Sequence, residues 1–132
     1  MHFRIILLNL GAELKNEPMT LQEIVTLLDA EVVLGQEQLD KTIRHAFAAD
    51  LMSDVLRLDT SEMLLITGLA NVQVIRTAEM SDICYILFVR GKQVSPEMKA
   101  LAESCGITLL QCKQSMFKAC GMLYDAGLLP IY

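Results

Sequence analysis

The chain has 132 residues, of which 53% are hydrophobic, and this length fits one domain that can bury its own core. Its formal net charge is −5 and it contains no basic run, so we do not expect a nucleic-acid partner, because that affinity comes largely from neutralising phosphates. A membrane span needs about 20 consecutive apolar residues. The longest such run covers only residues 83–89, so we expect no membrane partner either.

The N-terminal segment, residues 1–18, comes before the first clear helix signal. Residues 3–10 indicate a strand or an extended arm, and no small-residue cleavage pattern of a signal peptide stands out. The four cysteines include no C-x-x-C pair and are expected to be buried free thiols: Cys84, Cys105, Cys112 and Cys120. Thiols without a signal peptide indicate a reducing compartment, so a cytoplasmic location is expected.

The first helix is predicted from Thr20 to about Asp29. Thr20 and Glu23 have the spacing of a capping box, and Met19 and Ile24 are placed for a hydrophobic staple. The predicted apolar face consists of Leu21, Ile24, Val25, Leu27 and Leu28.

Two short strands and a short helix are predicted next. The strands cover residues 31–34 and 42–48, and the polar segment 36–40 separates them. Asp50 is placed to cap the short helix, which is followed by a polar turn over residues 59–62. The predicted apolar face of this helix consists of Leu51, Met52, Val55 and Leu56.

Strands and helices alternate from Met63 onward. Strands are predicted at residues 63–67, 83–89 and 107–110, and their unbroken apolar runs are typical of strands covered on both faces. Three helices are predicted between and after these strands. The first follows Gly68, and its apolar residues are roughly in phase: Val72, Ile75, Ala78 and Met80. The second runs from Ser95-Pro96 to Gly106, and the third covers 115–126 with an inward face of Met116, Phe117, Cys120, Leu123 and Tyr124. The order predicts a single α/β domain with a mostly parallel or mixed central sheet and helices on both faces.

The segment around Asp50 is the first candidate site. Asp50, Ser53 and Asp54 place two carboxylates and a hydroxyl close together at a helix start, where they could contact a small ligand or a metal. The plainer interpretation is a helix cap followed by an acidic first turn. Because no histidine or third oxygen ligand lies nearby, we expect no metal site.

Two further candidates follow the ends of predicted strands. Thr67, Gly68 and Asn71 lie where a buried strand gives way to a helix, a place where open α/β sheets bind ligands. Arg90 and Gly91 follow the next strand, where Arg90 together with Lys92 would favour an anion. The alternative in each case is an ordinary loop between strand and helix.

No set of acid, base and nucleophile is visible, so we expect no catalytic residues and no cofactor. His45 is the only interior histidine and has no assignable partner, so a strand-surface or hydrogen-bonded histidine is expected.

The stretch from Met19 to Gly127 resembles the DRTGG domain family. The most specific string is Ala49-Asp50-Leu51-Met52-Ser53-Asp54-Val55-Leu56. Further strings that carry the resemblance are residues 19–25, 30–33, 39–41, 64–68, 95–96 and 102–107. The five-residue string that names the family, Asp-Arg-Thr-Gly-Gly, does not occur here, and residues 1–18 lie outside the likeness.

The resemblance implies an α/β fold like the N-terminal domain of HPr kinase/phosphorylase, confined to residues 19–132. In larger proteins, such as some phosphotransacetylases, the domain sits beside catalytic domains and is taken as a regulatory or ligand-sensing part. Some stand-alone versions are encoded near iron hydrogenases, which implies a link to redox metabolism.

Our first hypothesis is therefore a non-catalytic, homodimeric module that binds a nucleotide or another small anionic metabolite and acts on a metabolic or redox enzyme. The second is a structural or protein-interaction subunit without a small ligand. The third is a small enzyme that uses Asp50, Asp54 or a cysteine.

Overall fold

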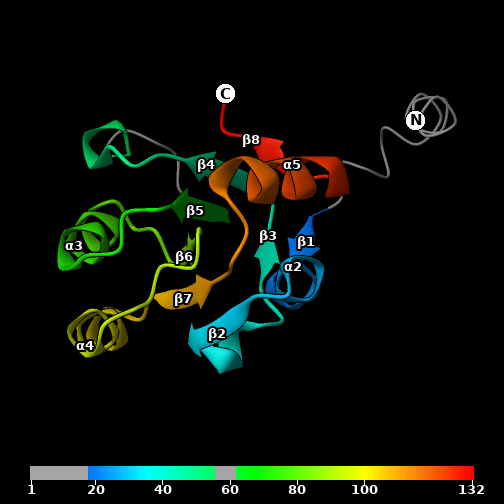
Figure 1. Cartoon of the computed structure of the whole chain (residues 1–132). Helices are drawn as coiled ribbons and strands as arrows, with labels where there is room; N and C mark the ends of the chain where they lie inside the picture. The colour runs from blue at the N-terminus through cyan, green and yellow to red at the C-terminus, as the bar shows by residue number, and fades with distance from the viewer. Residues whose placement is uncertain (1–17, 56–61) are drawn as a thin grey trace, which may run out of the picture.

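A mixed sheet of six strands forms the centre of the molecule, in the order β2-β7-β6-β5-β4-β8 (Figure 1). The computed structural model describes residues 18–55 and 62–132, apart from the side chain of Asp54. The strands are β2 (Glu31–Leu34), β4 (His45–Ala48), β5 (Met63–Thr67), β6 (Tyr85–Phe88), β7 (Thr108–Gln111) and β8 (Leu129–Pro130). All neighbours pair in parallel except β2, which runs antiparallel to β7.

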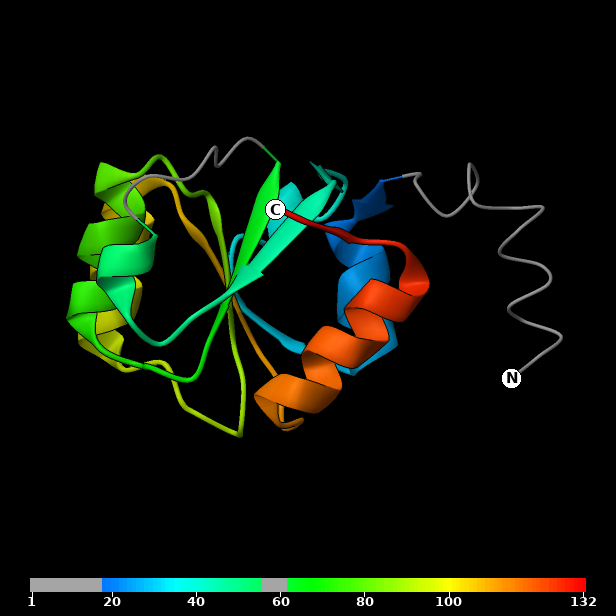
Figure 2. The same cartoon turned by 90° about the horizontal axis from the view of Figure 1, so that it is seen from above.

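Helices cover both faces of this sheet, as Figure 2 shows with the sheet between them. On one face lie α3 (Val72–Met80) and α4 (Pro96–Cys105), and on the other lie α2 (Leu21–Leu28) and α5 (Met116–Ala126). Smaller elements are the two-stranded sheet of β1 (Met19–Thr20) and β3 (Thr42–Ile43) and the 3-10 helices η1 (Gln36–Gln38) and η2 (Met52–Asp54). The predicted single α/β domain with a mixed sheet is confirmed.

The core has two halves because successive strand residues point to opposite faces. Leu64, Ile66 and Leu87 pack with α2 and α5, whereas Leu65 and Ile86 pack with α3 and α4. All five residues of β5 are buried. The apolar runs of these strands are unbroken because helices cover both faces of the sheet, as the sequence indicated.

The predicted helix boundaries are set by the capping residues that the sequence marks. Thr20 and Glu23 form the complete capping box, with the Glu23 amide donating to Thr20 Oγ1 (3.1 Å) and the Thr20 amide donating to Glu23 Oε1 (3.0 Å). Ser95 accepts from the Met98 amide at the start of α4. Gly106 ends that helix in the left-handed conformation, with φ +72°.

The strand predicted over 42–48 is instead two strands in two different sheets. β3 pairs with β1, whereas β4 pairs with β5 and β8. The chain changes sheet at Arg44, whose amide donates to the Glu62 carbonyl (2.9 Å) and whose carbonyl accepts from the Leu129 amide (3.0 Å). No glycine or proline marks this change, so local pattern does not reveal it.

In two helices, the side that is buried differs from the predicted apolar face. In α5, Phe117 and Tyr124 were expected inward, but they are 90% and 71% exposed. Ala119 takes the place against the sheet, because a small side chain there lets the helix pack closely beside Leu123. In α3, Met80 is likewise exposed rather than in phase with Ile75.

Smaller differences concern η2, the strand ends and the thiols. Leu51 is exposed, so it does not belong to an apolar face, and Leu56 and residues 59–61 lie outside the described part of the chain, as does the segment 1–17. β6 is shorter than predicted and β7 is shifted by one residue. Of the four thiols only Cys112 is buried; Cys105 and Cys120 are half-buried, and Cys84, which directly precedes β6, is exposed. Within the described residues, no helix combines the length and apolar character that crossing a bilayer requires.

The covered strand β6 gives a direct test of the fold. Ile86→Ala and Leu87→Ala, which face opposite halves of the core, are each expected to lower the free energy of unfolding by about 2–5 kcal/mol in urea titrations. Leu27→Ala, at a partly exposed position of α2, is the control and should cost less than about 1 kcal/mol. If only one of the two β6 variants is destabilised, β6 is covered on one face and the topology described above is wrong.

Candidate functional site

The carboxyl ends of four parallel strands meet along one edge of the sheet. Asp50 lies just beyond β4, Gly68 follows β5, Arg90 lies just beyond β6 and Gln114 lies beyond β7. Backbone hydrogen bonds tie these ends together: the Val89 amide donates to the Thr67 carbonyl (3.0 Å) and the Arg90 amide donates to the Gln114 carbonyl (2.7 Å). We call this edge, with the loops after β4, β5, β6 and β7, the carboxyl edge.

The Asp50 carboxylate is the centre of a network at this edge. Its Oδ1 accepts a hydrogen bond from Thr67 Oγ1 (3.0 Å) and another from the Gly68 amide (2.8 Å). The Thr67 hydroxyl, fully buried, accepts in turn from the Leu69 amide (3.1 Å). Asp50 is therefore not the helix cap that its position suggested, since η2 begins after Leu51 without a side-chain cap.

Arg90 joins the network from the next strand. Its Nη2 donates to the Gly68 carbonyl (3.2 Å) and lies 3.9 Å from Asp50 Oδ2. A Cβ at position 68 would come within 2.6 Å of Arg90 Nε, so glycine is required for the guanidinium to lie against this turn. Both charged side chains remain about half exposed to solvent.

The remaining predicted site residues occupy different positions around this network. Asn71 caps α3, with its Oδ1 accepting from the Val74 amide (3.1 Å), and Ser53 is exposed in η2. Gly91 has φ +70°, and its amide donates to the Cys112 carbonyl (3.0 Å). The side chain of Asp54 lies outside the described part of the structure. The structure thus brings Asp50, Thr67, Gly68 and Arg90 into direct contact.

A crevice lies beside this network, at the point where the connections that follow two neighbouring strands go to opposite faces of the sheet. The chain leaves β6 toward α4 on one face and leaves β7 toward α5 on the other, and in open α/β sheets ligands bind at such a switch point. The crevice has a volume of about 90 Å³. Its lining consists of Asp29, Glu31, Gly91, Lys92, Gln93, Gln111, Cys112 and Lys113.

A wider hollow of about 360 Å³ adjoins the crevice, with Asp29 and Lys113 lining both. Its other lining residues are Leu28, Gln114 and Lys118. Gln114 donates from Nε2 to the Leu28 carbonyl (2.8 Å), while its buried Oε1 has no hydrogen-bond partner among the residues that the structure describes. Three lysines, Lys92, Lys113 and Lys118, therefore surround this end of the carboxyl edge.

Sequence reasoning did not select Lys113 or Gln114, although a usable signal was present. Both follow the predicted strand at 107–110, and the same rule that pointed to Thr67 and Arg90 applies there. What the sequence could not show is that α5 lies on the opposite face from α4, which is why the switch falls between β6 and β7. The lysine expected beside Thr67, Lys92, lines this crevice together with Gly91.

Three of the four thiols are poorly suited to act as nucleophiles. Burial raises the pKa of the Cys112 thiol in the crevice and that of the Cys120 thiol on α5. A hydrogen bond from Cys105 Sγ to Glu79 Oε2 (3.0 Å) raises the pKa of Cys105. Because the thiolate is the reactive form, these three thiols are poor nucleophiles at neutral pH. No group of three or more potential metal ligands occurs among the residues that the structure describes.

Comparison with known proteins fits the geometry described above. The family model of the DRTGG domain matches residues 23–126. A solved structure similar to this chain contains the CBS and DRTGG domains of the regulatory region of Clostridium perfringens pyrophosphatase, complexed with the activator diadenosine tetraphosphate. The similarity covers 93% of this chain and 51% of that chain, with a TM-score of 0.67 and 19% sequence identity. No curated protein matches the chain.

The six-stranded sheet with helices on both faces, together with the likeness to the solved structure, defines a mixed α/β domain. The chain belongs to the DRTGG domain family. It spans about half the length of the similar structure, which also contains CBS domains. At this level of identity that likeness establishes the fold of this chain and not its ligand.

The Asp50 network predicts a specific stability difference between two variants. Asp50→Ala removes the acceptor of two hydrogen bonds, and we expect it to lower the free energy of unfolding by about 1–3 kcal/mol. Asp50→Asn keeps an oxygen acceptor at Oδ1 and should cost clearly less. Thermal and urea unfolding measure both. Equal stability of Asp50→Ala and the unsubstituted protein would show that the network does not hold the strand ends together.

Proposed function

We propose that this chain is a non-catalytic regulatory module that binds a small anionic ligand, such as a nucleotide, at its carboxyl edge and acts on a metabolic or redox enzyme. The observation that carries the proposal is the crevice at the switch point between β6 and β7, whose lining includes Lys92 and Lys113 together with two carboxylates. The neighbouring structure, a regulatory region in complex with a nucleotide activator, supports this class of function.

The two parts of the carboxyl edge have different roles in this proposal. The hydrogen-bonding groups of Asp50, Thr67 and Gly68 are used within the protein, so this network holds the strand ends at fixed positions. The side chains of Lys92 and Lys113 supply the positive charge that an anion requires. Arg90 and Gly91 belong to the loop that joins the network to the crevice. The predicted residues Ser53, Asp54 and Asn71 extend the proposed ligand-binding edge toward η2 and α3.

Acidic side chains in the same crevice narrow the class of ligand that we propose, because they favour an anion that also carries hydroxyl groups. Asp29 and Glu31 lie among the lining residues, and Glu31 Oε2 accepts from Gln111 Nε2 (2.6 Å). Carboxylates accept hydrogen bonds from hydroxyl groups, whereas lysines attract phosphate. A ligand with both phosphate and ribose hydroxyls, as in a nucleotide, satisfies both kinds of side chain.

A second candidate function, a protein-interaction subunit without a small ligand, has its own observation. Phe117 and Tyr124 project from α5 into solvent, and exposed aromatic side chains of this kind are enriched in protein interfaces. We propose that the module is a cytoplasmic homodimer and that its functional unit is residues 19–132.

Calorimetric titration with ATP, AMP and inorganic phosphate tests the ligand proposal. We expect at least one nucleotide to bind with a Kd below about 1 mM, and the double variant Lys92→Ala/Lys113→Ala to weaken it at least tenfold. The double variant Lys41→Ala/Lys99→Ala removes the same charge from exposed positions outside the crevice and is the matched control. No binding by any of the three probes, or equal weakening by both double variants, would contradict a site in this crevice.

A further inference from the structure

The aromatic residues of this domain are distributed unusually. Phe88 is fully buried in the core, whereas Phe117 and Tyr124 on α5 are 90% and 71% exposed. Phe117 and Tyr124 lie two helical turns apart on α5, so both project from the same side of that helix. Leu129 of the edge strand β8 is also exposed. An exposed aromatic side chain contributes little to the stability of the isolated domain, so these residues require another explanation.

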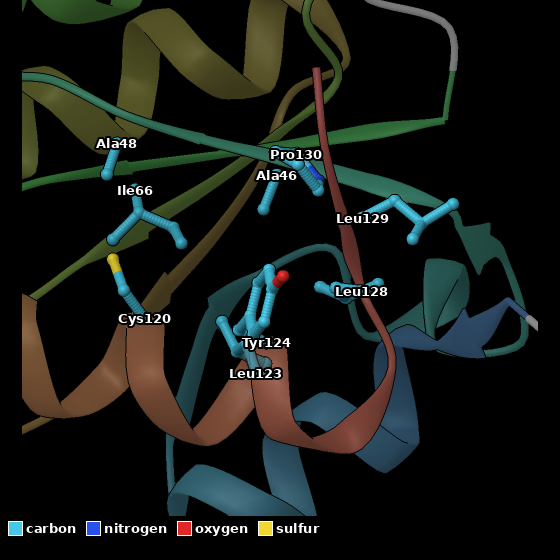
Figure 3. A pocket seen from close by; sticks show the side chains of 9 residues that line it. All are labelled: Ala46, Ala48, Ile66, Cys120, Leu123, Tyr124, Leu128, Leu129 and Pro130. Carbon is cyan, nitrogen blue, oxygen red and sulfur yellow. The ribbon is translucent and has the colours of Figure 1, made fainter. Parts of the chain in front are cut away.

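An apolar groove lies beside Tyr124, between α5 and the sheet edge formed by β4 and β8 (Figure 3). Its lining consists of Ala46, Ala48, Ile66, Cys120, Leu123, Tyr124, Leu128, Leu129 and Pro130. The groove exists because the strand that covers β4 is short: β8 pairs only with His45 and Ala46. Small side chains, Ala48 on the strand and Cys120 on the helix, leave space where larger ones would meet.

The groove and the projecting Phe117 match each other in size and chemistry. The groove volume is about 190 Å³, and an apolar cavity of about 150 Å³ is large enough to bind benzene. Phe117 and the groove residue Cys120 are three positions apart on α5, so an aromatic projection and an aromatic-sized hollow lie side by side on one face. A face that carries both parts is self-complementary, as the twofold interface of a homodimer requires.

We propose that a second copy of this chain docks on this face, with Phe117 of each subunit inserted into the groove of the other. The two α5 helices run antiparallel and cross near Gly121. Gly121 lies between Phe117 and Tyr124 on the exposed side of the helix, and a Cβ there would meet nothing within 4 Å. The glycine therefore leaves room for the backbone of the partner helix at the crossing point.

The two exposed aromatic side chains of this face can supply about half of the area that a stable dimer needs. Large aromatic side chains each bury about 150–250 Å², and a specific interface buries about 800 Å² per partner. The two exposed aromatic residues of this face, Phe117 and Tyr124, can supply about 300–500 Å² of that area. The groove walls supply more when they are covered.

This inference rests on the proposed homodimer, but it does not depend on ligand binding at the carboxyl edge. Sedimentation equilibrium of the full chain, from about 1 to 100 µM, measures the dimer Kd. Phe117→Ala should weaken the dimer about 100-fold, because each dimer contains two copies of the contact and each loses about tenfold. Ala48→Leu fills the groove and should weaken it as well. Neither change touches the buried core, and circular dichroism with thermal unfolding checks that both variants remain folded.

Met80→Ala is the matched control, because Met80 is also a large exposed apolar residue but lies on α3, over the opposite face of the sheet. Its dimer Kd should equal that of the unsubstituted protein. A dimer that is unaffected by Phe117→Ala and Ala48→Leu would overturn this face while leaving the homodimer intact. A protein that stays monomeric at 100 µM would overturn both, and the calorimetric result for the ligand would be unaffected.

Discussion

Helices cover both faces of strands β5 and β6, and the rest of the molecule depends on this constraint. Each residue of β5 is buried, and Ile86, Leu87 and Phe88 of β6 are buried beside it. Apart from Thr67, whose hydroxyl joins the Asp50 network at the end of β5, these strand positions are occupied by core side chains. Polar chemistry is therefore confined to the loops at the strand ends, and contacts with other proteins are confined to the sheet edges and the outer sides of the helices.

The carboxyl edge shows how such a sheet positions polar groups. One carboxylate, that of Asp50, holds the end of β5 through Thr67 and Gly68, and Arg90 adds the end of β6. The loops that follow β6 and β7 then diverge to opposite faces and open the lysine-lined crevice between them. The network and the crevice are thus consecutive parts of one edge: the first fixes the strand ends, and the second faces solvent with charge that a ligand can use.

Much of this architecture could be predicted from the sequence, and the errors have identifiable physical causes. The capping residues Thr20 and Ser95 and the unbroken apolar run of β5 gave correct elements because each is a local signal. The change of sheet at Arg44 and the role of Asp50 depend on partners far along the chain, such as Glu62 and Thr67, which no local pattern contains. The sequence pattern places Phe117 and Tyr124 in the core, because hydrophobicity alone does not distinguish a buried helix face from an exposed one.

Backbone amide NMR of the ¹⁵N-labelled protein, titrated in turn with ATP, AMP and inorganic phosphate, tests the central claim most directly. The claim is that the carboxyl edge binds a small anionic ligand. It predicts saturable shifts concentrated at the amides of Gly91, Lys92, Lys113 and Gln114, with smaller shifts at Gly68 and none at α4 residues such as Lys99. Shifts centred elsewhere in the domain, or no saturable shift with any of the three probes at millimolar concentration, would contradict it.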